Sequence, residues 1–395
     1  MSLYLTKEEE GILDGEYGER KRKALEILVA VGTIYGAEKF IPVKSAQLSG
    51  VSYKTMGKEG TEFIKDFSDE RVSVPTYLNP CGMDTERWKE MGIDETFAQN
   101  QKGLLEAYRS MRVTMSLTCT PYYIRKPKSG EHLAWAESSA VVYANAICGA
   151  RTNREGGPSA LASAIIGKTP CYGLHMAKNR RAEVIIEIKE KIEKEEYGLL
   201  GVHVGRIVGA KIPYFVGLHH RGDCLKQLGA AMAASGAVAM FHVEKTTPEW
   251  RKSLSGKREK IIVEKNDLEE TKDSITTEEI PQLYAFGCPH LSLREIGEIA
   301  GMLEKGRVRG KIWLCTSRYI KRKADRLGYT KIIERHGMLL CDTCMVVSPI
   351  ENLFSITATN SGKAAVYLPS FCKQKVVFDS AKKLLKFEGI RRGLV

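Results

Sequence analysis

Short apolar runs alternate with amphipathic stretches over the last hundred-odd residues of the chain. Ser292 and Glu295 match a helix capping box, and apolar residues at helical spacing follow them as far as Leu303. The pattern also predicts strands and helices, the strands at 283–286, 311–314, 338–347 and 354–357 and the helices at 319–327 and 380–387. Strands and helices that alternate in this way form a mostly parallel sheet with helices on both faces.

The N-terminal two thirds of the chain alternate less regularly. Thr6 with Glu9 matches a helix capping box, and apolar residues recur at helical spacing from Ala24 to Ile34, so the N-terminus is expected to be helical. Apolar runs that open into polar loops predict buried strands at 41–43, 72–74 and 113–117. A strand–helix–strand unit is expected at 214–218, 224–236 and 237–243, and the polar stretch 244–277 is the expected linker.

These elements predict an α/β fold with about three covered sheets, or subdomains, around a central cleft. The length of 395 residues suits two or three domains. We expect an N-terminal α/β region at 1–200, a middle α/β region with the polar linker at 201–280, and a C-terminal α/β region at 281–395.

The chain carries 60 Lys and Arg against 48 Asp and Glu, a net charge of +12. The basic residues form scattered clusters with acids nearby, so we expect a small anionic substrate or an acidic partner subunit in place of nucleic acid. A basic nucleic-acid-binding protein remains the alternative from another class, and it predicts a steep salt dependence. The absence of a long apolar window or a signal-like start predicts a cytoplasmic protein that does not bind membranes.

Three of the ten cysteines share an unusual context. Cys119 in SLTCTPYY, Cys288 in YAFGCPHLS and Cys344 in LCDTCMVVSP lie at or just past apolar, strand-like runs. Ligands bind at the carboxyl ends of parallel strands, so these thiols could converge on one crevice, although ordinary buried cysteines remain the alternative. With Cys341, which forms a CxxC pair with Cys344, they suggest thiolate ligation of zinc or iron. Because no second CxxC exists, an iron–sulfur cluster with one open iron fits better than structural zinc.

Polar residues that follow other apolar runs are the candidate substrate contacts. The loop from Ser49 to Ser52 places Gly50 and Val51 between a strand and a helix, where backbone N–H groups can bind phosphate or carboxylate. An ordinary strand–helix connection is the alternative there. The further candidates beyond this loop are Asn79, Pro80, Glu137, Ser138 and Lys363.

The sequence resembles the aconitase X family over essentially its whole length. The motifs that carry the resemblance stand in family order: KSAQLSGVSYKT, the Asn79-Pro80 pair, TCTPYY, AESSAVVYANA, EGGP, GCPH, DTCMVVSP and NSGK. The resemblance implies an aconitase-like fold and an iron–sulfur hydro-lyase. It further implies a [4Fe-4S] cluster, or else a [2Fe-2S] cluster, on Cys119, Cys288 and Cys344, with Cys341 a buried neighbour. By the same resemblance Gly50, Val51, Ser52, Asn79, Pro80, Glu137, Ser138 and Lys363 line the substrate pocket.

The resemblance also implies a substrate and a partner. The expected reaction converts (R)-5-phosphomevalonate to trans-anhydromevalonate 5-phosphate and water, in an archaeal route to isoprenoids. A dehydratase of cis-3-hydroxy-L-proline or of another hydroxy acid is the alternative within the family. Relatives use a swivelling domain that bears a catalytic serine base, and the chain reaches Val395 without one. We therefore expect a separate small subunit to supply that domain and no catalytic base in this chain.

Overall fold

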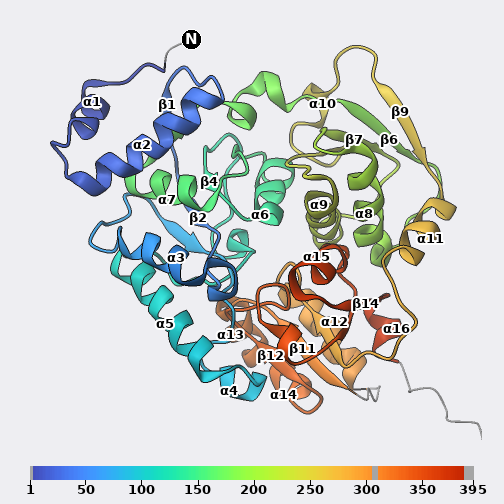
Figure 1. The fold of residues 1–395 in the computed structure, drawn as a ribbon. Helices are drawn as coiled ribbons and strands as arrows, with labels where there is room; N and C mark the ends of the chain where they lie inside the picture. The colour runs from blue at the N-terminus through green and yellow to red at the C-terminus, as the bar shows by residue number, and fades with distance from the viewer. Residues whose placement is uncertain (1–2, 305–309, 387–395) are drawn as a thin grey trace, which may run out of the picture.

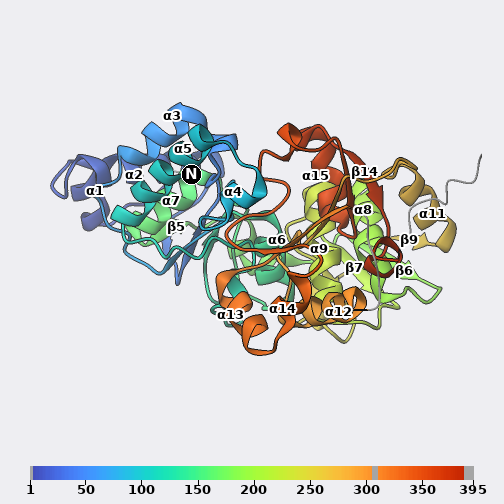
Figure 2. The same cartoon turned by 90° about the horizontal axis from the view of Figure 1, so that it is seen from below.

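The structure is a computed structural model that describes residues 3–304 and 310–386 (Figure 1). Three parallel sheets organise these residues, with strand orders β3-β2-β4, β8-β7-β6-β9 and β12-β11-β10-β13-β14. A separate antiparallel pair, β1–β5, lies beside α2 in the N-terminal region. The three parallel sheets occupy three regions of the molecule, which Figures 1 and 2 show in blue to cyan, green to yellow, and orange to red. The α/β fold expected from the sequence is confirmed.

The N-terminal region contains the three-stranded sheet. Its strands are β1 (Phe40–Pro42), β2 (Ala46–Leu48), β3 (Thr76–Leu78), β4 (Ala134–Trp135) and β5 (Lys168–Pro170). Its helices are α1 (Lys7–Leu13), α2 (Glu19–Ile34), α3 (Tyr53–Lys65), α4 (Trp88–Met91), α5 (Glu95–Ser110), α6 (Ser138–Val142) and α7 (Gly157–Ile166). All residues of β2, β3 and β4 are buried, as the apolar runs of a sheet covered on both faces require.

The helical N-terminus is confirmed, but the predictions of two strands in this region were wrong. The Thr6–Glu9 capping box starts α1, and Gly15 and Gly18, both at positive φ, separate α1 from α2. The runs 72–74 and 113–117 are not regular strands. Pro75 precedes the ladder of β3, and in the second run Thr114 makes only an isolated bridge to Tyr77.

The middle region contains the four-stranded sheet. Its elements are β6 (Val184–Ile188), α8 (Tyr197–Val208), β7 (Pro213–Val216), α9 (Asp223–Gly236), β8 (His242–Val243), α10 (Trp250–Ser253), β9 (Glu259–Val263) and α11 (Lys265–Asp273). The prediction of a linker at 244–277 was wrong, because this segment supplies α10, β9 and α11, and β9 pairs with β6 along five residues. The segment looks polar because β9 is an edge strand with mostly exposed side chains.

Small residues let α8 pack directly on α9. A Cβ added to Gly201 would lie 2.5 Å from the carbonyl oxygen of Leu228. We therefore expect Gly201→Ala to destabilise the protein by about 1–3 kcal/mol, although alanine is the better helix former. The matched control is Gly301→Ala in α12 (Leu293–Leu303), where nothing lies within 4 Å of the new Cβ and a gain of about 0.5–1 kcal/mol is expected. Urea unfolding of both variants measures the difference, and equal stabilities would contradict the packing.

The C-terminal region contains the five-stranded sheet. Its strands are β10 (Leu283–Phe286), β11 (Lys311–Cys315), β12 (Met338–Leu340), β13 (Ile356–Thr359) and β14 (Lys375–Phe378). Its helices are α12 (Leu293–Leu303), α13 (Arg318–Arg326), α14 (Tyr329–Ile333), α15 (Gly362–Cys372) and α16 (Ala381–Leu384). The predicted capping box of Ser292 and Glu295 is confirmed at α12.

Three details of this region differ from the expected pattern. The strand expected at 338–347 ends at Leu340, because Asp342 has φ +65° and turns the chain out of the sheet. The strand expected at 354–357 lies at Ile356–Thr359. The last expected helix is the short α16, and position 387 lies outside the described residues. No helix in the described ranges is both long and apolar enough to cross a bilayer.

Candidate active site

The candidate residues follow the carboxyl ends of strands in two of the three sheets. In the N-terminal region, β2 leads into residues 49–52, β3 into Asn79 and Pro80, and β4 into Glu137. In the C-terminal region, β10 leads into Cys288, β12 into Cys344 and β13 into Lys363. In the strand orders β3-β2-β4 and β12-β11-β10-β13-β14, the strands that follow β2 or β10 in the chain are added first on one side of it and then on the other. Ligands of parallel α/β sheets bind at such points.

The two sheets are joined at these ends. Cys81, two residues after Asn79, forms a parallel bridge with Thr343, and its N–H donates to the carbonyl oxygen of Asp342 at 2.7 Å. The hydroxyl of Ser52 donates to the carbonyl oxygen of Val347 at 2.7 Å. The loops after β2 and β3 therefore lie against the segment that carries Cys344.

The thiols of Cys119, Cys288 and Cys344 are brought together and buried. The Cys288 and Cys344 thiols hydrogen-bond to one another, and Cys119 Sγ accepts a hydrogen bond from the backbone N–H of His290 at 3.2 Å. No group of three or more His, Cys, Asp or Glu within residues 3–304 and 310–386 is spaced to hold a single metal ion. A cluster spreads its thiolate ligands over different irons, so three thiols that are buried together suit a cluster better than one ion.

A left-handed residue stands just before each of the three cysteines. Leu117 has φ +41°, Gly287 has φ +106° and Asp342 has φ +65°. At Gly287 a Cβ would lie 2.2 Å from the carbonyl oxygen of Cys315, so only glycine fits. A positive φ costs conformational energy at a residue other than glycine, yet a residue with positive φ precedes each of the three cysteines. This indicates that the fold fixes the positions of the thiols.

Glu137 and Lys363 form a buried ion pair between the two regions, their side chains 11% and 7% exposed. Glu137 caps α6 and also accepts hydrogen bonds from Ser139 N–H at 3.3 Å and from Asn79 Nδ2 at 2.8 Å. Burial alone would raise the pKa of Glu137, but the Lys363 charge and these hydrogen bonds hold it at about 2. Burial lowers the pKa of Lys363, and the Glu137 carboxylate more than reverses that shift. Both groups are therefore charged at neutral pH.

Asn79 presents a free acceptor beside this pair. Its amide nitrogen is held by Glu137, which leaves Oδ1 buried and without a hydrogen-bond partner in the part of the chain that the structure describes. Buried acceptors are rarely left unsatisfied, and this one is suited to a substrate hydroxyl. Ser138 lies next to Glu137, with its hydroxyl 3.5 Å from Glu137 Oε1, and Pro80 is buried beside Asn79.

The loop after β2 is held so that its N–H groups stay free. The carbonyl oxygens of Gly50 and Val51 accept hydrogen bonds from Tyr108 OH at 3.2 Å and Gln101 Nε2 at 2.8 Å. Within the described residues, the N–H groups of Gly50, Val51 and Ser52 donate no hydrogen bond. Successive free N–H groups at the start of α3 are suited to bind an anion.

Cys341 occupies a different environment from its CxxC neighbour. Its backbone N–H donates to Asp84 Oδ2 at 2.8 Å. Burial and the nearby carboxylates of Asp342 and Asp84 raise the pKa of the Cys341 thiol. The pKa values of the Cys119 and Cys288 thiols are raised as well, so what sets Cys341 apart is its carboxylate neighbours, whereas the other three thiols lie near the ammonium of Lys363.

Three residues of the site were not found from the sequence. Gln101 binds Gly82 N–H and Tyr53 N–H through Oε1, Ser361 donates to the carbonyl oxygen of Cys288, and His290 contacts all three cysteine segments. His290 and Ser361 lie in the motifs GCPH and NSGK, which carry the family resemblance but assign no function to either residue. Gln101 lies within α5, and no local pattern marks it.

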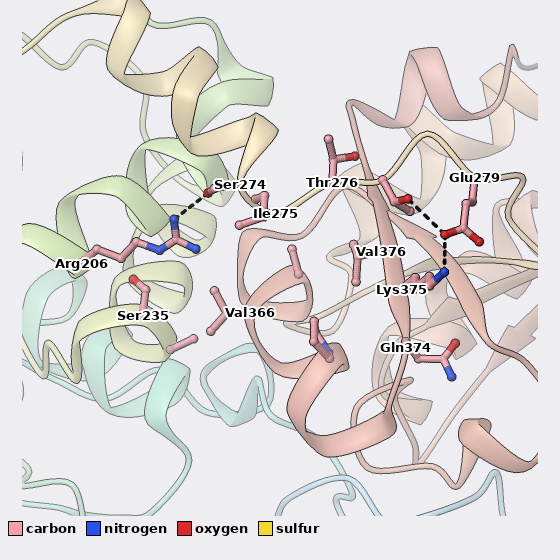
Figure 3. Close-up of a pocket in the computed structure, with 14 residues that line it drawn as sticks. Arg206, Ser235, Ser274, Ile275, Thr276, Glu279, Val366, Gln374, Lys375 and Val376 are labelled. Carbon is pink, nitrogen blue, oxygen red and sulfur yellow. Dashed lines mark hydrogen bonds and ion pairs between the residues drawn. The ribbon is translucent and has the colours of Figure 1, made fainter.

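A separate hollow of about 520 Å³ lies between α8, the end of α11, and α15 with β14 (Figure 3). Its charged side chains already have partners, since Arg206 donates to Ser274 and Lys375 to Glu279. None of the candidate site residues lines it. This hollow is therefore not the site built by the two sheets.

Comparison with known proteins agrees with this geometry. The first, second and third domains of aconitase X match residues 2–178, 182–273 and 281–388. The chain belongs to the aconitase X family. The boundaries expected near residues 200 and 280 remain a prediction. A crystal structure of Thermococcus kodakaraensis aconitase X in its holo-form is 48% identical, with a TM-score of 0.92, and the match covers 97% of this chain and 99% of that one.

Relatives within aconitase X carry two activities in their names. The phosphomevalonate dehydratase large subunit of Methanocaldococcus jannaschii is 53% identical, over 97% of this chain and all of the relative. The cis-3-hydroxy-L-proline dehydratase of Hypocrea jecorina is 32% identical, over 96% of this chain but 67% of the relative. The family and the aconitase-like fold expected from the sequence are confirmed, and neither relative is named as a nucleic-acid-binding protein.

Proposed function

We propose that this chain is the large subunit of a phosphomevalonate dehydratase. The enzyme would convert (R)-5-phosphomevalonate to trans-anhydromevalonate 5-phosphate and water. The observation that carries the proposal is the convergence of three buried thiols, the Glu137–Lys363 pair and a loop of free N–H groups at the carboxyl ends of two sheets. The high identity to a relative of that name supports the choice of substrate.

The donor set fits an iron–sulfur cluster on Cys119, Cys288 and Cys344. The thiols are buried together, and near them the hydroxyl oxygens of Thr343 and Tyr122 have no partner within the described residues. Such hydroxyls are suited to donate hydrogen bonds to a cluster. We propose a [4Fe-4S] cluster, with [2Fe-2S] as the alternative. When bound, the cluster supplies a Lewis acid for the hydroxyl that leaves as water and for the neighbouring carboxylate.

The residues of this chain bind and orient the substrate. The N–H groups of Gly50, Val51 and Ser52 bind one anionic end of the molecule, and Lys363 supplies a positive charge beside the thiols. Asn79 Oδ1 accepts a hydrogen bond from a substrate hydroxyl. Glu137 is ionised and fully engaged, so it cannot donate a proton and instead holds Lys363 and Asn79 in place.

The substrate proton that is removed in the reaction needs a base that is not among these residues. We propose that a small subunit with a swivelling domain supplies it through a serine. The relative from Methanocaldococcus jannaschii is named a large subunit, and this chain covers only 67% of the Hypocrea jecorina dehydratase. The net charge of +12 suits both an acidic partner and a phosphorylated substrate.

The substrate is tested with the large and small subunits purified together without oxygen. We expect dehydration of 5-phosphomevalonate, and a kcat/KM at least about 100-fold lower for mevalonate, because the phosphate no longer contributes binding energy to orientation. The ultraviolet absorbance of the α,β-unsaturated product is followed as it appears, and mass spectrometry confirms the loss of one water. Faster dehydration of cis-3-hydroxy-L-proline than of 5-phosphomevalonate would favour the alternative substrate.

A further inference from the structure

The imidazole of His290 is completely buried among the three cysteine-bearing segments. It lies two residues after Cys288. Its backbone N–H donates to Cys119 Sγ at 3.2 Å, and its ring nitrogens lie 2.9 Å from Thr118 Oγ1 and 2.9 Å from the carbonyl oxygen of Thr343. The imidazole therefore contacts the residue before Cys119 and the residue before Cys344, and it belongs to the segment that carries Cys288.

The partners of the ring define one tautomer. Nε2 faces the carbonyl oxygen of Thr343, which can only accept, so Nε2 carries the proton. Nδ1 must then accept from the hydroxyl of Thr118. That hydroxyl oxygen in turn accepts from the N–H of Thr120 at 3.1 Å and lies 3.0 Å from the Thr120 hydroxyl. The chain of hydrogen bonds has one direction, from Thr120 through Thr118 to His290 and on to Thr343.

The middle region holds His290 from the other side. Lys226 on α9 is buried, and its ammonium donates to the carbonyl oxygen of His290 at 3.2 Å. Glu295 accepts from the same ammonium, and Asp223 lies 3.7 Å from it. Both backbone polar groups and both ring nitrogens of His290 are thus engaged, by partners from all three regions of the molecule.

We infer that His290 is a positioning residue that sets the spacing of Cys119, Cys288 and Cys344 for the cluster, with Lys226 anchoring it to the middle sheet. The inference rests on the ligand set proposed above. His290 is not itself a ligand, because both of its ring nitrogens are occupied by protein partners. Partners of this kind orient ligands, and their loss commonly weakens metal binding by about 10–100-fold.

The test compares His290→Ala, His290→Gln and Thr118→Val with wild type after anaerobic reconstitution with iron and sulfide. The matched control is His242→Gln, because His242 is equally buried and its Nε2 also faces a carbonyl oxygen, that of Arg180, at 2.8 Å in the middle region. We expect His290→Ala to release the cluster to a chelator about 10–100-fold faster. We expect partial rescue by His290→Gln, whose amide N–H can reach Thr343, and wild-type behaviour of the control.

The near-isosteric Thr118→Val variant keeps the test decisive if His290→Ala does not fold. It removes only the hydroxyl at Nδ1, so we expect a folded protein with an altered electron paramagnetic resonance spectrum of the reduced cluster. Wild-type release rates and spectra in His290→Gln and Thr118→Val would overturn the inference, as would equal losses in His242→Gln.

A readout without iron separates this inference from the proposed function. Phenylarsine oxide bridges two nearby thiols, and in the apoprotein it reports the spacing of Cys288 and Cys344 directly. We expect about tenfold weaker binding in His290→Ala and no change in His242→Gln, with Cys288→Ala as the blank. A wild-type protein that takes up no cluster would refute the proposed function while this arm still decides the role of His290. Unchanged arsenical binding in His290→Ala, with cluster lost in the cysteine variants, would refute the role of His290 alone.

Discussion

Replacing Lys363 with methionine is expected to lower kcat/KM by about 100-fold or more and to destabilise the apoprotein by about 3–5 kcal/mol. The change leaves the Glu137 carboxylate buried without its cation and removes the positive charge beside the three thiols. Glu137→Gln combined with Lys363→Met removes both charges, so we expect it to recover most of the stability and none of the activity. Urea unfolding and steady-state kinetics measure the two effects.

The pH dependence of the free energy of unfolding provides a second test of the Glu137–Lys363 pair. The folded pKa of Glu137 is about 2, below its ordinary value of 4.5, so its contribution is present above pH 4.5 and is lost as the pH falls towards 2. In Lys363→Met, burial raises that pKa instead, so the free energy of unfolding should increase as the pH falls from 8 to 5. The control is Lys375→Met, whose pair with Glu279 is exposed and should contribute at most about 1 kcal/mol. Equal losses in the two lysine variants would contradict the buried pair.

Single replacements of Cys119, Cys288 or Cys344 by alanine are expected to reduce bound iron and acid-labile sulfide by at least about tenfold and to abolish dehydration. Each removes one of three thiolates that the cluster is proposed to need. Cys341→Ala is the matched control, since Cys341 is equally buried and lies three residues from Cys344, yet faces carboxylates. Iron and sulfide analysis after anaerobic purification decides the matter. Cluster retained in Cys344→Ala and lost in Cys341→Ala would reverse the assignment.

Only some of the strands that lead into the candidate site were predicted from the sequence. The run 283–286 coincides with β10, which leads into Cys288 at the edge where a parallel sheet presents its loops. The runs expected at 41–43 and 72–74 end before β2 and β3 begin, and the run expected at 338–347 continues past the end of β12. The edge strand β9 was missed because its exposed side chains resemble a linker.

Other parts of the site depend on contacts that no local pattern carries. Gln101 looks like any polar residue of a helix until the fold brings it to the loop after β2. His290 stands in a recognisable motif, but its role depends on Thr118 and Thr343, which lie 172 and 53 residues away in the chain. The pairing of Glu137 with Lys363 follows only when two sheets meet.

The distance along the chain between Glu137 and Lys363 has a consequence for biosynthesis. The two residues are 226 positions apart, so at about 5–20 residues per second a ribosome takes roughly 10–45 s to add the lysine after the glutamate. During that interval the nascent chain holds a carboxylate whose cation has not yet been made. Completion of the buried pair, and assembly of the site where the cluster is proposed to bind, therefore belong to the end of translation or later.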